Sequence, residues 1–246
     1  MSDLSYKGSE LELFEKAENW KAYYQNLIRD YLGHEVLEVG AGIGATTRAL
    51  CGEKQSRWVC LEPDPVLGER IRKLVMSHEL PSSCEVRVGL ISDLQPHEKF
   101  DTIIYIDVLE HIENDRAELK LSLTHLKSGG FLVVLSPAHQ WLYTPFDEAI
   151  GHHRRYNKKS LSTVIPEGLE QVELKYLDCV GALASLGNRF ILKSNIPSAK
   201  QLSLWDKLMI PMSKALDPLL RYRAGKSVLG VWRKAILDNP QITHIR

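Results

Sequence analysis

The feature that most constrains the fold of this chain is a regular alternation of short apolar runs with segments of helical periodicity. Runs that are apolar almost throughout are typical of strands buried on both faces, and helices between them are typical of parallel β-α-β units. The sequence therefore predicts an α/β domain with a doubly wound, mostly parallel, seven-stranded sheet. The predicted strands are residues 36–39, 58–61, 86–88, 102–106, 131–135, 172–177 and 227–232, and the helices between them include 45–50, 65–76 and 115–126.

Two further segments extend this core. Apolar residues recur at spacings of three and four along residues 10–31, which predicts one helix at the start of the domain. Residues 181–224 are too long for an ordinary connection, so we expect a helical cap inserted before the last strand and interrupted at Pro211 and Pro218. We expect a single domain, residues 1–246, made of an N-terminal helical segment (1–33), a cofactor-binding core (34–136), an acceptor loop (137–160) and the cap (181–224).

Charge is unevenly distributed along a chain that is neutral in total. Residues 1–180 hold 20 basic and 28 acidic side chains, a net −8, whereas residues 181–246 hold 11 basic and 3 acidic, a net +8. Neutrality of the whole argues against a nucleic-acid partner, while the basic cap shifts the expected ligand toward one with negative charge.

The cap also carries apolar residues at helical spacing. We expect this stripe to press onto the core as a lid, and we favour that over contact with an anionic membrane or with a partner subunit, as in a homodimer. Its residues are Leu202, Trp205, Leu208, Met209, Met212, Leu216, Leu219 and Leu220.

The composition is that of a globular protein from a reducing compartment. A content of 44% apolar and 25% charged residues excludes a disordered chain. The four cysteines form no Cys-x-x-Cys pair, and the first residues contain no apolar secretory segment. We therefore predict reduced thiols and a cytoplasmic location.

A glycine-rich turn follows the first predicted strand and precedes a helix. Gly40, Gly42 and Gly44 permit positive φ angles and let a ligand approach the bare backbone. The following helix presents its first N–H groups to the same place. Because Gly40, Gly42 and Ala45 also satisfy G-x-G-x-x-G/A, a nicotinamide dinucleotide site is an alternative.

Two glutamates help to choose between cofactors. Glu62 ends the second predicted strand, where a carboxylate would hold the two hydroxyl groups of a ribose in either kind of cofactor. Glu38 lies two residues before Gly40, and a carboxylate there would repel a pyrophosphate but attract an ammonium or sulfonium group. Glu38 therefore favours a cationic ligand such as S-adenosylmethionine.

Four motifs in order resemble those of the class I S-adenosylmethionine-dependent methyltransferases. They are Glu38-Val-Gly-Ala-Gly-Ile-Gly44, Trp58-Val-Cys-Leu-Glu62, the segment from Phe100 to Ile112 and the segment from Leu126 to Leu135. The resemblance spans about residues 34–136 and implies a Rossmann-like methyltransferase fold with S-adenosylmethionine as cofactor. One departure is that Gly89 is followed by Leu90 and not by the aspartate that many relatives use for adenine.

The resemblance also implies which residues contact the cofactor. The glycine loop would lie under the methionine part, Glu62 would hold the ribose, with Asp64 beside the adenine, and the backbone near Leu90 and Ile91 would hold the adenine. The expected cofactor-binding residues are Glu38, Gly40, Ala41, Gly42, Gly44, Glu62, Pro63, Leu90, Ile91, Asp107 and Val108.

Histidines mark the side on which a methyl acceptor would bind. Histidine is the natural base near neutral pH, and the candidates are His111, His139, His152 and His153. The loop that holds the last three resembles a bacterial subgroup linked with polysaccharide or secondary-metabolite pathways, and it offers Trp141, Tyr143, Arg154 and Tyr156 as acceptor-binding residues. No metal is predicted, because the spacing of His139, Asp147, His152 and His153 matches no fixed ligand motif.

The sequence thus predicts an enzyme that transfers a methyl group from S-adenosylmethionine to a small molecule. A hydroxyl oxygen is the favoured acceptor atom, as in saccharide or secondary-metabolite methylation. The alternatives are methylation of an amine nitrogen, a nicotinamide-dependent oxidoreductase, and a cofactor-binding or membrane-adapter protein without catalytic activity.

Overall fold

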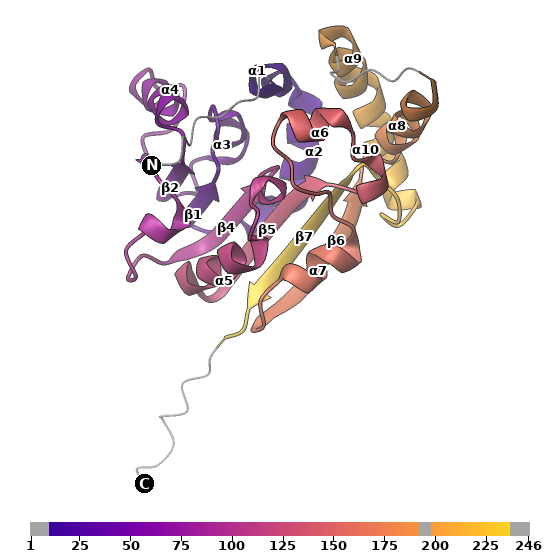
Figure 1. Ribbon diagram of the computed structural model, residues 1–246. Coiled ribbons are helices and arrows are strands. Elements are labelled where there is room, and N and C mark those ends of the chain that lie inside the picture. The colour runs from indigo at the N-terminus through magenta and orange to yellow at the C-terminus, as the bar shows by residue number, and fades with distance from the viewer. Residues whose placement is uncertain (1–9, 192–197, 237–246) are drawn as a thin grey trace.

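A computed structural model of the chain describes residues 10–191 and 198–236. These residues form a seven-stranded sheet in the order β3-β2-β1-β4-β5-β7-β6, in which only β7 runs antiparallel to its neighbours. The predicted strands are all present, and the prediction of a doubly wound sheet is confirmed (Figure 1). The strands are β1 (Glu35–Val39), β2 (Arg57–Glu62), β3 (Cys84–Val88), β4 (Phe100–Ile106), β5 (Leu126–Pro137), β6 (Leu169–Leu177) and β7 (Ser227–Lys234).

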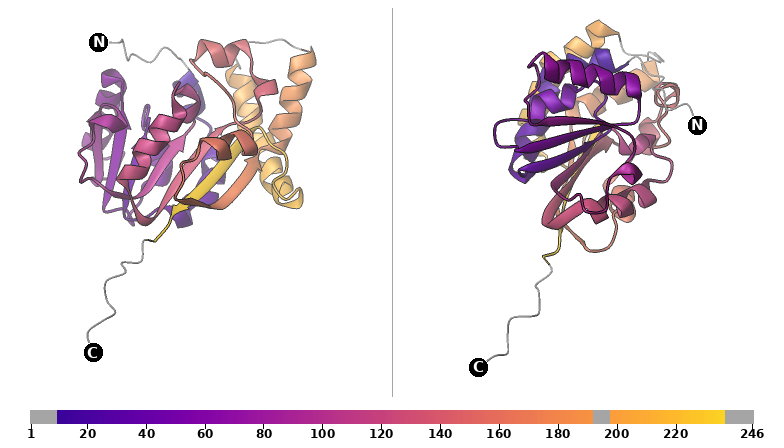
Figure 2. Two further views of the ribbon diagram at one scale, coloured as in Figure 1. Left: turned by 60° about the horizontal axis from the view of Figure 1, so that its bottom comes forward. Right: turned by 90° about the vertical axis from the view of Figure 1, so that its left-hand side faces the viewer.

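Helices cover both faces of the sheet (Figures 1 and 2). Neighbouring residues of one strand, such as Val36 and Leu37 in β1, belong to two separate apolar clusters because successive side chains point to opposite faces. One cluster includes α2, α3 and α4, and the other includes α5 and α7. The helices are α1 (Glu10–Glu15), α2 (Glu18–Ile28), α3 (Ala45–Leu50), α4 (Pro65–Met76), α5 (Asp115–His125), α6 (Pro145–Ala149), α7 (Lys158–Val164), α8 (Cys179–Ile191), α9 (Ala199–Leu204) and α10 (Ile210–Leu219).

The helix predicted for residues 10–31 is divided into α1, α2 and a final 3-10 turn. The ammonium group of Lys21 donates to the backbone carbonyls of Phe14, Glu15 and Ala17, so it caps the end of α1. The first N–H groups of α2 lie beside Asp206 of the cap, and the Trp20 N–H donates to its carboxylate at 2.9 Å. Periodicity alone could not reveal this break, because both halves bury apolar residues.

The cap is present between β6 and β7, but the two prolines do not interrupt it as expected. α9, a π-helical turn (Trp205–Met209) and α10 follow one another without a gap. Pro211 stands in the first turn of α10, directly after the wider π turn, and Pro218 stands in its last turn. A proline has no N–H to donate, and the continuous helix accommodates Pro211 where the π turn widens it and Pro218 where it ends.

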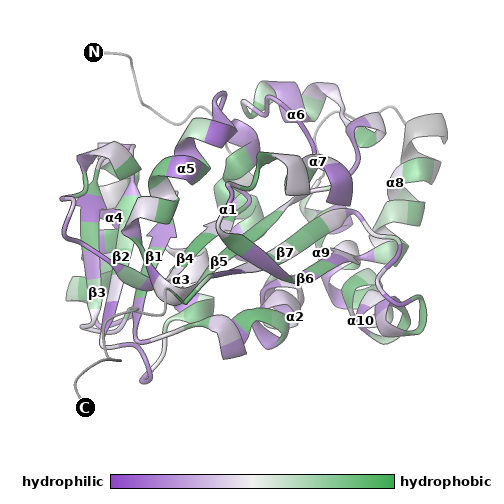
Figure 3. Ribbon diagram, turned by 90° about the horizontal axis from the view of Figure 1, so that it is seen from below, coloured by the Kyte–Doolittle hydropathy of each residue, from purple (hydrophilic) through white to green (hydrophobic). Residues whose placement is uncertain are grey.

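The stripe predicted to face the core is largely exposed. Leu208, Met212, Leu216, Leu219 and Leu220 are each at least 40% exposed, and hydrophobic segments of α8 and α10 lie at the edge of the molecule (Figure 3). Leu202 is the one residue of the stripe that is buried, and the other buried residues of α9, the π turn and α10 are Asp206, Ile210, Ser213 and Asp217.

Buried polar groups fix the cap to the core. Asp217 accepts hydrogen bonds from the Tyr23 hydroxyl at 2.8 Å and from the N–H groups of Asp178 and Cys179 at 2.8 and 3.0 Å. The cap therefore packs on α2 and on the end of β6, and the expected apolar lid is not formed. Within residues 10–191 and 198–236, no helix is long and apolar enough to cross a membrane.

All four cysteines are unpaired thiols. Cys60, Cys84 and Cys179 are buried and Cys51 is partly buried. The Sγ atoms of Cys51 and Cys84, which are far apart in the sequence, lie 3.6 Å from each other.

Candidate active site

The glycine-rich turn joins β1 to α3 at the carboxyl edge of the sheet. Its three glycines have left-handed backbones, with φ of 70° at Gly40, 57° at Gly42 and 79° at Gly44. A Cβ atom on Gly40 would lie 2.6 Å from Val108 Cγ2, whereas one on Gly42 would meet nothing closer than Leu11 of α1 at 3.7 Å. Gly40 is thus required by packing, while the backbone of Gly42 lies open to a ligand.

Glu38 lies beneath this loop and is 2% exposed. One of its carboxylate oxygens accepts hydrogen bonds from the Thr47 hydroxyl and the Trp58 indole, each at 2.7 Å. Burial raises the pKa of Glu38 to about 7, although these two hydrogen bonds act in the opposite direction. Glu38 is therefore held inside the cofactor half of the molecule, and its carboxyl group is only partly ionised near pH 7.

Glu62 ends β2 and connects that strand to the glycine loop. Its two oxygens accept hydrogen bonds from the Gly42 N–H at 2.7 Å and the Asp64 N–H at 3.0 Å. Burial raises the pKa of Glu62 as well. A carboxylate oxygen has more than one acceptor position, so these bonds leave capacity for the hydroxyl groups of a ribose.

Two of the residues expected around adenine form hydrogen bonds within the protein instead. Asp64 does not extend toward a ligand but caps α4, accepting from the Val66 N–H at 2.7 Å. The Leu90 N–H donates to the Asp93 carboxylate at 2.7 Å, so this backbone group is not free to hold adenine as expected. Ile91 is buried, and the Leu90 side chain is 45% exposed beside the loop. Pro63 lies between Glu62 and Asp64 at the end of β2.

The turn after β4 carries Asp107, Val108 and a short 3-10 turn, Leu109–His111. Asp107 is exposed and has a left-handed backbone, with φ of 55°. Because Val108 packs against Gly40, this turn is adjacent to the glycine loop.

The same turn meets the loop that follows β5. The imidazole rings of His111 and His152 lie edge to face, with centroids 4.5 Å apart. His152 Nε2 is 3.9 Å from Glu110 Oε1, and Glu110 is fully buried. Burial and the neighbouring His152 lower the pKa of His111 to about 4, so its ring is neutral near pH 7.

Asp147 supports this cluster from behind. It accepts a hydrogen bond from His152 Nδ1 at 2.9 Å and paired hydrogen bonds from the Arg155 guanidinium at 2.7 and 2.8 Å. Although burial opposes them, these bonds hold the pKa of Asp147 well below its usual value. Asp147 therefore fixes the His152 ring, with Nε2 as the nitrogen on the side of Glu110.

The rings of the other two candidate histidines do not join this pair, although the His153 N–H donates to the Glu110 carbonyl oxygen at 2.8 Å. His139 has a left-handed backbone, with φ of 67°, and its ring packs on Trp141 and Tyr176 at centroid distances of 5.2 and 4.7 Å. The side chain of His153 is exposed. The Tyr143 hydroxyl donates to the backbone carbonyl of His152, so Tyr143 borders the cluster through the main chain.

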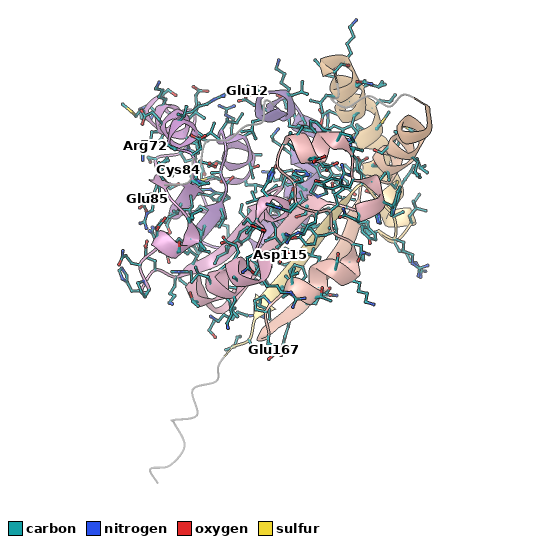
Figure 4. All side chains as sticks on the ribbon, viewed as in Figure 1. Glu12, Arg72, Cys84, Glu85, Asp115 and Glu167 are labelled. Atoms are coloured by element: carbon teal, nitrogen blue, oxygen red, sulfur yellow. The ribbon has the colours of Figure 1, made fainter. Side chains whose placement is uncertain are left out.

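Arg154 and Tyr156 do not offer free groups to an anionic acceptor as expected. The Arg154 guanidinium donates to the Asp115 carboxylate at 2.6 Å, and the Tyr156 hydroxyl donates to the same carboxylate at 2.7 Å. Tyr156 is 2% exposed. Asp115 begins α5 at the front of the molecule (Figure 4), and these bonds attach the loop after β5 to that helix.

Sequence reasoning missed three members of the site. Glu110, Asp147 and Arg155 were not among the expected site residues, yet Glu110 and Asp147 lie beside His152 and Arg155 holds Asp147. Glu110 could have been noticed because it adjoins His111 in the turn after a central strand. For Asp147 and Arg155 no signal in the sequence distinguishes a buried ion pair from a charged loop.

The sheet order and the open glycine turn at the end of β1 define a Rossmann-like protein that binds a nucleotide-containing cofactor at the carboxyl edge of its strands. A sequence model of the family described as "Methyltransferase domain" matches residues 12–168, and the chain belongs to this family. It is a methyltransferase that uses S-adenosylmethionine. The family match overturns the alternative of a nicotinamide-dependent oxidoreductase. No curated protein sequence matches the chain significantly.

Solved structures with low sequence identity share the fold. A putative sarcosine dimethylglycine methyltransferase from Galdieria sulphuraria is 18% identical, with a TM-score of 0.58 over 89% of this chain and 86% of that one. Mitomycin 7-O-methyltransferase is 15% identical, with a TM-score of 0.57 over 92% of this chain and 54% of that one. Coclaurine N-methyltransferase, bound to N-methylheliamine and S-adenosylhomocysteine, is 14% identical, with a TM-score of 0.59 over 86% and 71%.

Proposed function

We propose that this methyltransferase acts on a hydroxyl oxygen of a small organic molecule. The observation that carries the proposal is the cluster of Glu110, His111 and His152 in the turns after β4 and β5. A hydroxyl group must lose its proton to become methylated, and this cluster supplies proton-accepting groups beside the cofactor-binding turn. The solved relatives include enzymes named for O- and for N-methylation, so they support a small-molecule acceptor without choosing the atom.

The cofactor would lie along the carboxyl ends of β1 and β2. The bare backbone of Gly40, Ala41, Gly42 and Gly44 would pass under its methionine part, with Glu38 buried below. Glu62 would accept hydrogen bonds from the ribose, while Pro63, Leu90 and Ile91 would border the adenine. Asp107 and Val108 would border the sulfonium side.

S-adenosylmethionine supplies a methyl group on a sulfonium: the acceptor oxygen forms the new O–C bond while the S–C bond breaks and leaves its electron pair on sulfur. The chain has to hold the acceptor oxygen in line with that bond and to take its proton. His152 is suited to this because Asp147 holds its Nδ1 and leaves Nε2 directed toward Glu110. His139, Trp141 and Tyr143 would form the wall of the acceptor pocket, with Tyr176 behind His139.

Replacing His152 tests this assignment. We expect His152→Ala to lower kcat/KM about 10²- to 10⁴-fold, the usual contribution of a general base, while leaving the affinity for S-adenosylhomocysteine unchanged in calorimetry. The control is His153→Ala, which removes an exposed imidazole from the neighbouring position. The acceptor would be sought by incubating the protein with labelled S-adenosylmethionine and a panel of phenols, sugars and amines, with product detection by mass spectrometry.

Methylation of an amine is the second candidate, favoured by one observation. Asp107 exposes a carboxylate next to the glycine loop, and Glu110 lies close enough for the two groups to affect each other. Burial and the neighbouring Asp107 raise the pKa of Glu110, so it is an ionised Asp107 that would attract an ammonium group. Label incorporated only into amines, with His152→Ala remaining active, would establish this alternative.

A further inference from the structure

Glu110 differs from the other buried carboxylates of the molecule. In the part of the chain that the structure describes, neither of its oxygens has a hydrogen-bond partner, and neither does the nearby hydroxyl of Ser136. Ser136 lies close enough to influence the Glu110 carboxyl group, but without hydrogen-bond geometry. A buried polar group without a partner is costly, so native proteins seldom retain one unless a ligand, an ion or water completes it.

Two imidazoles approach this carboxylate. One potential ligand atom from each of Glu110, His111 and His152 lies within 4.8 Å of the others. Two atoms that each bind one cation at about 2.1 Å are at most about 4.2 Å apart, so small side-chain rotations bring all three into range. The three residues come from two loops at the end of the central strands, which hold them from different directions.

The groups behind the cluster are those that a metal-binding histidine requires. The Nδ1 atom of His152 is held by Asp147, which leaves Nε2 on the side of Glu110 at 3.9 Å. Arg155 and the Thr144 N–H in turn hold Asp147. A carboxylate that binds the second nitrogen of a ligating histidine fixes its tautomer and strengthens it as a ligand.

We propose that Glu110, His111 and His152 form a binding site for one divalent transition-metal cation. Two imidazoles and one carboxylate suit Fe²⁺, Co²⁺, Ni²⁺ or Zn²⁺ better than Mg²⁺, which prefers oxygen ligands. Three protein ligands leave coordination positions open on the acceptor side of the methyl donor. There the cation, in place of His152 Nε2, would help a hydroxyl group to lose its proton, because Nε2 cannot bind a cation and a proton at the same time. That role rests on the proposed function, whereas the cation site does not.

The test uses Co²⁺ as a probe, because its visible absorption reports coordination directly. The full chain, first treated with a chelator and dialysed, is titrated with CoCl₂ and followed by absorption and calorimetry. We expect one Co²⁺ per chain, displaced by an equal amount of Zn²⁺. Glu110→Gln, His111→Ala and His152→Ala should each weaken Co²⁺ binding at least tenfold, whereas the matched control His153→Ala should bind as the wild type does.

Titration with S-adenosylhomocysteine separates this proposal from the proposed function. Absence of Co²⁺ binding by the wild type, or binding that persists unchanged in all three variants, would overturn the cation site. Co²⁺ binding in a protein that binds no S-adenosylhomocysteine would leave the cation site intact and remove the proposed function. Should either histidine variant fail to fold, Glu110→Gln decides, because it keeps the size of the side chain.

Discussion

The two sides of β4 at the carboxyl edge of the sheet are built differently. On the cofactor side, Glu38, Glu62 and Asp64 are buried, and each accepts hydrogen bonds from the chain itself. On the acceptor side, Glu110 and Ser136 are buried without partners among the described residues. The chain thus satisfies the buried carboxylates beside the glycine turn by itself, whereas Glu110 would gain partners from the cation proposed above.

The largest effect should follow from crowding the glycine loop. Gly40→Ala places a Cβ atom 2.6 Å from Val108 in a left-handed backbone, and we expect the free energy of unfolding to fall by about 2–5 kcal/mol. Gly42→Ala is the matched control: it shares the left-handed backbone but meets open space, so it should cost about 1–2 kcal/mol.

Denaturation and calorimetry together distinguish the two glycines. Gly42→Ala should lose affinity for S-adenosylhomocysteine more than tenfold while remaining folded, because its methyl group enters the cofactor's space. Equal destabilisation by both substitutions would show that Gly40 and Gly42 have the same role, contrary to the geometry.

The next effect concerns Glu38, a buried carboxyl group that has hydrogen-bond partners but ionises only near neutral pH. The folded protein holds the Glu38 proton up to about pH 7, whereas an unfolded glutamate loses it near its ordinary pKa of 4.5. The wild type therefore loses stability as the pH rises between these values, by about 3 kcal/mol in total. Glu38→Gln, which can still accept from Thr47 and Trp58, should escape this loss.

Urea denaturation at pH 5 and pH 8 measures the difference. Glu38→Gln should be more stable than the wild type by about 3 kcal/mol at pH 8 and by much less at pH 5. A difference that does not change with pH would contradict the assignment of this titration to Glu38.

A matched pair of substitutions compares the two sides directly. Glu62→Met removes the acceptor for two buried N–H groups, so it should lower the free energy of unfolding by about 1–3 kcal/mol. Glu110→Met removes a buried group that has no partner, so in the presence of a chelator it should raise that free energy or leave it unchanged. Thermal unfolding of both variants measures the change in stability. A loss of stability in both would contradict the difference drawn between Glu62 and Glu110.

The smallest effect should come from the ion pairs that hold α1 beside the glycine loop. Arg70 contacts Glu12 at 2.8 Å and Glu15 at 3.5 Å, all with exposed or partly exposed side chains, and Glu12 and Arg72 mark the two helices in Figure 4. Arg70→Ala should cost less than about 1 kcal/mol of stability and speed the release of S-adenosylhomocysteine a few-fold at low salt. Arg72→Ala, whose partner Glu69 lies on the same helix, is the control in stopped-flow release measurements.

Much of the architecture was predictable because it follows from local patterns. The strands of the core were found from their apolar runs, and α3 and α4 agree with the predicted ranges. The left-handed conformation of Gly40, Gly42 and Gly44 was also expected, since only glycine adopts it without strain. The cap was placed correctly but oriented wrongly, because Asp206 and Asp217 are buried as acceptors for backbone N–H groups and the apolar face was left outside.

The sequence by itself determined the sheet, the glycine turn and the class of cofactor, because each depends on residues that are close together in the chain. Tertiary structure alone decided which of the loop histidines joins the buried cluster of Glu110, His111 and Asp147. His139, His152 and His153 lie in one loop and cannot be told apart from the sequence, yet only the His152 side chain lies beside Glu110, His111 and Asp147. The reason is that this cluster joins the turn after β4 to the loop after β5, and the packing of those two segments, with Arg154 and Tyr156 on Asp115, is a property of the folded molecule.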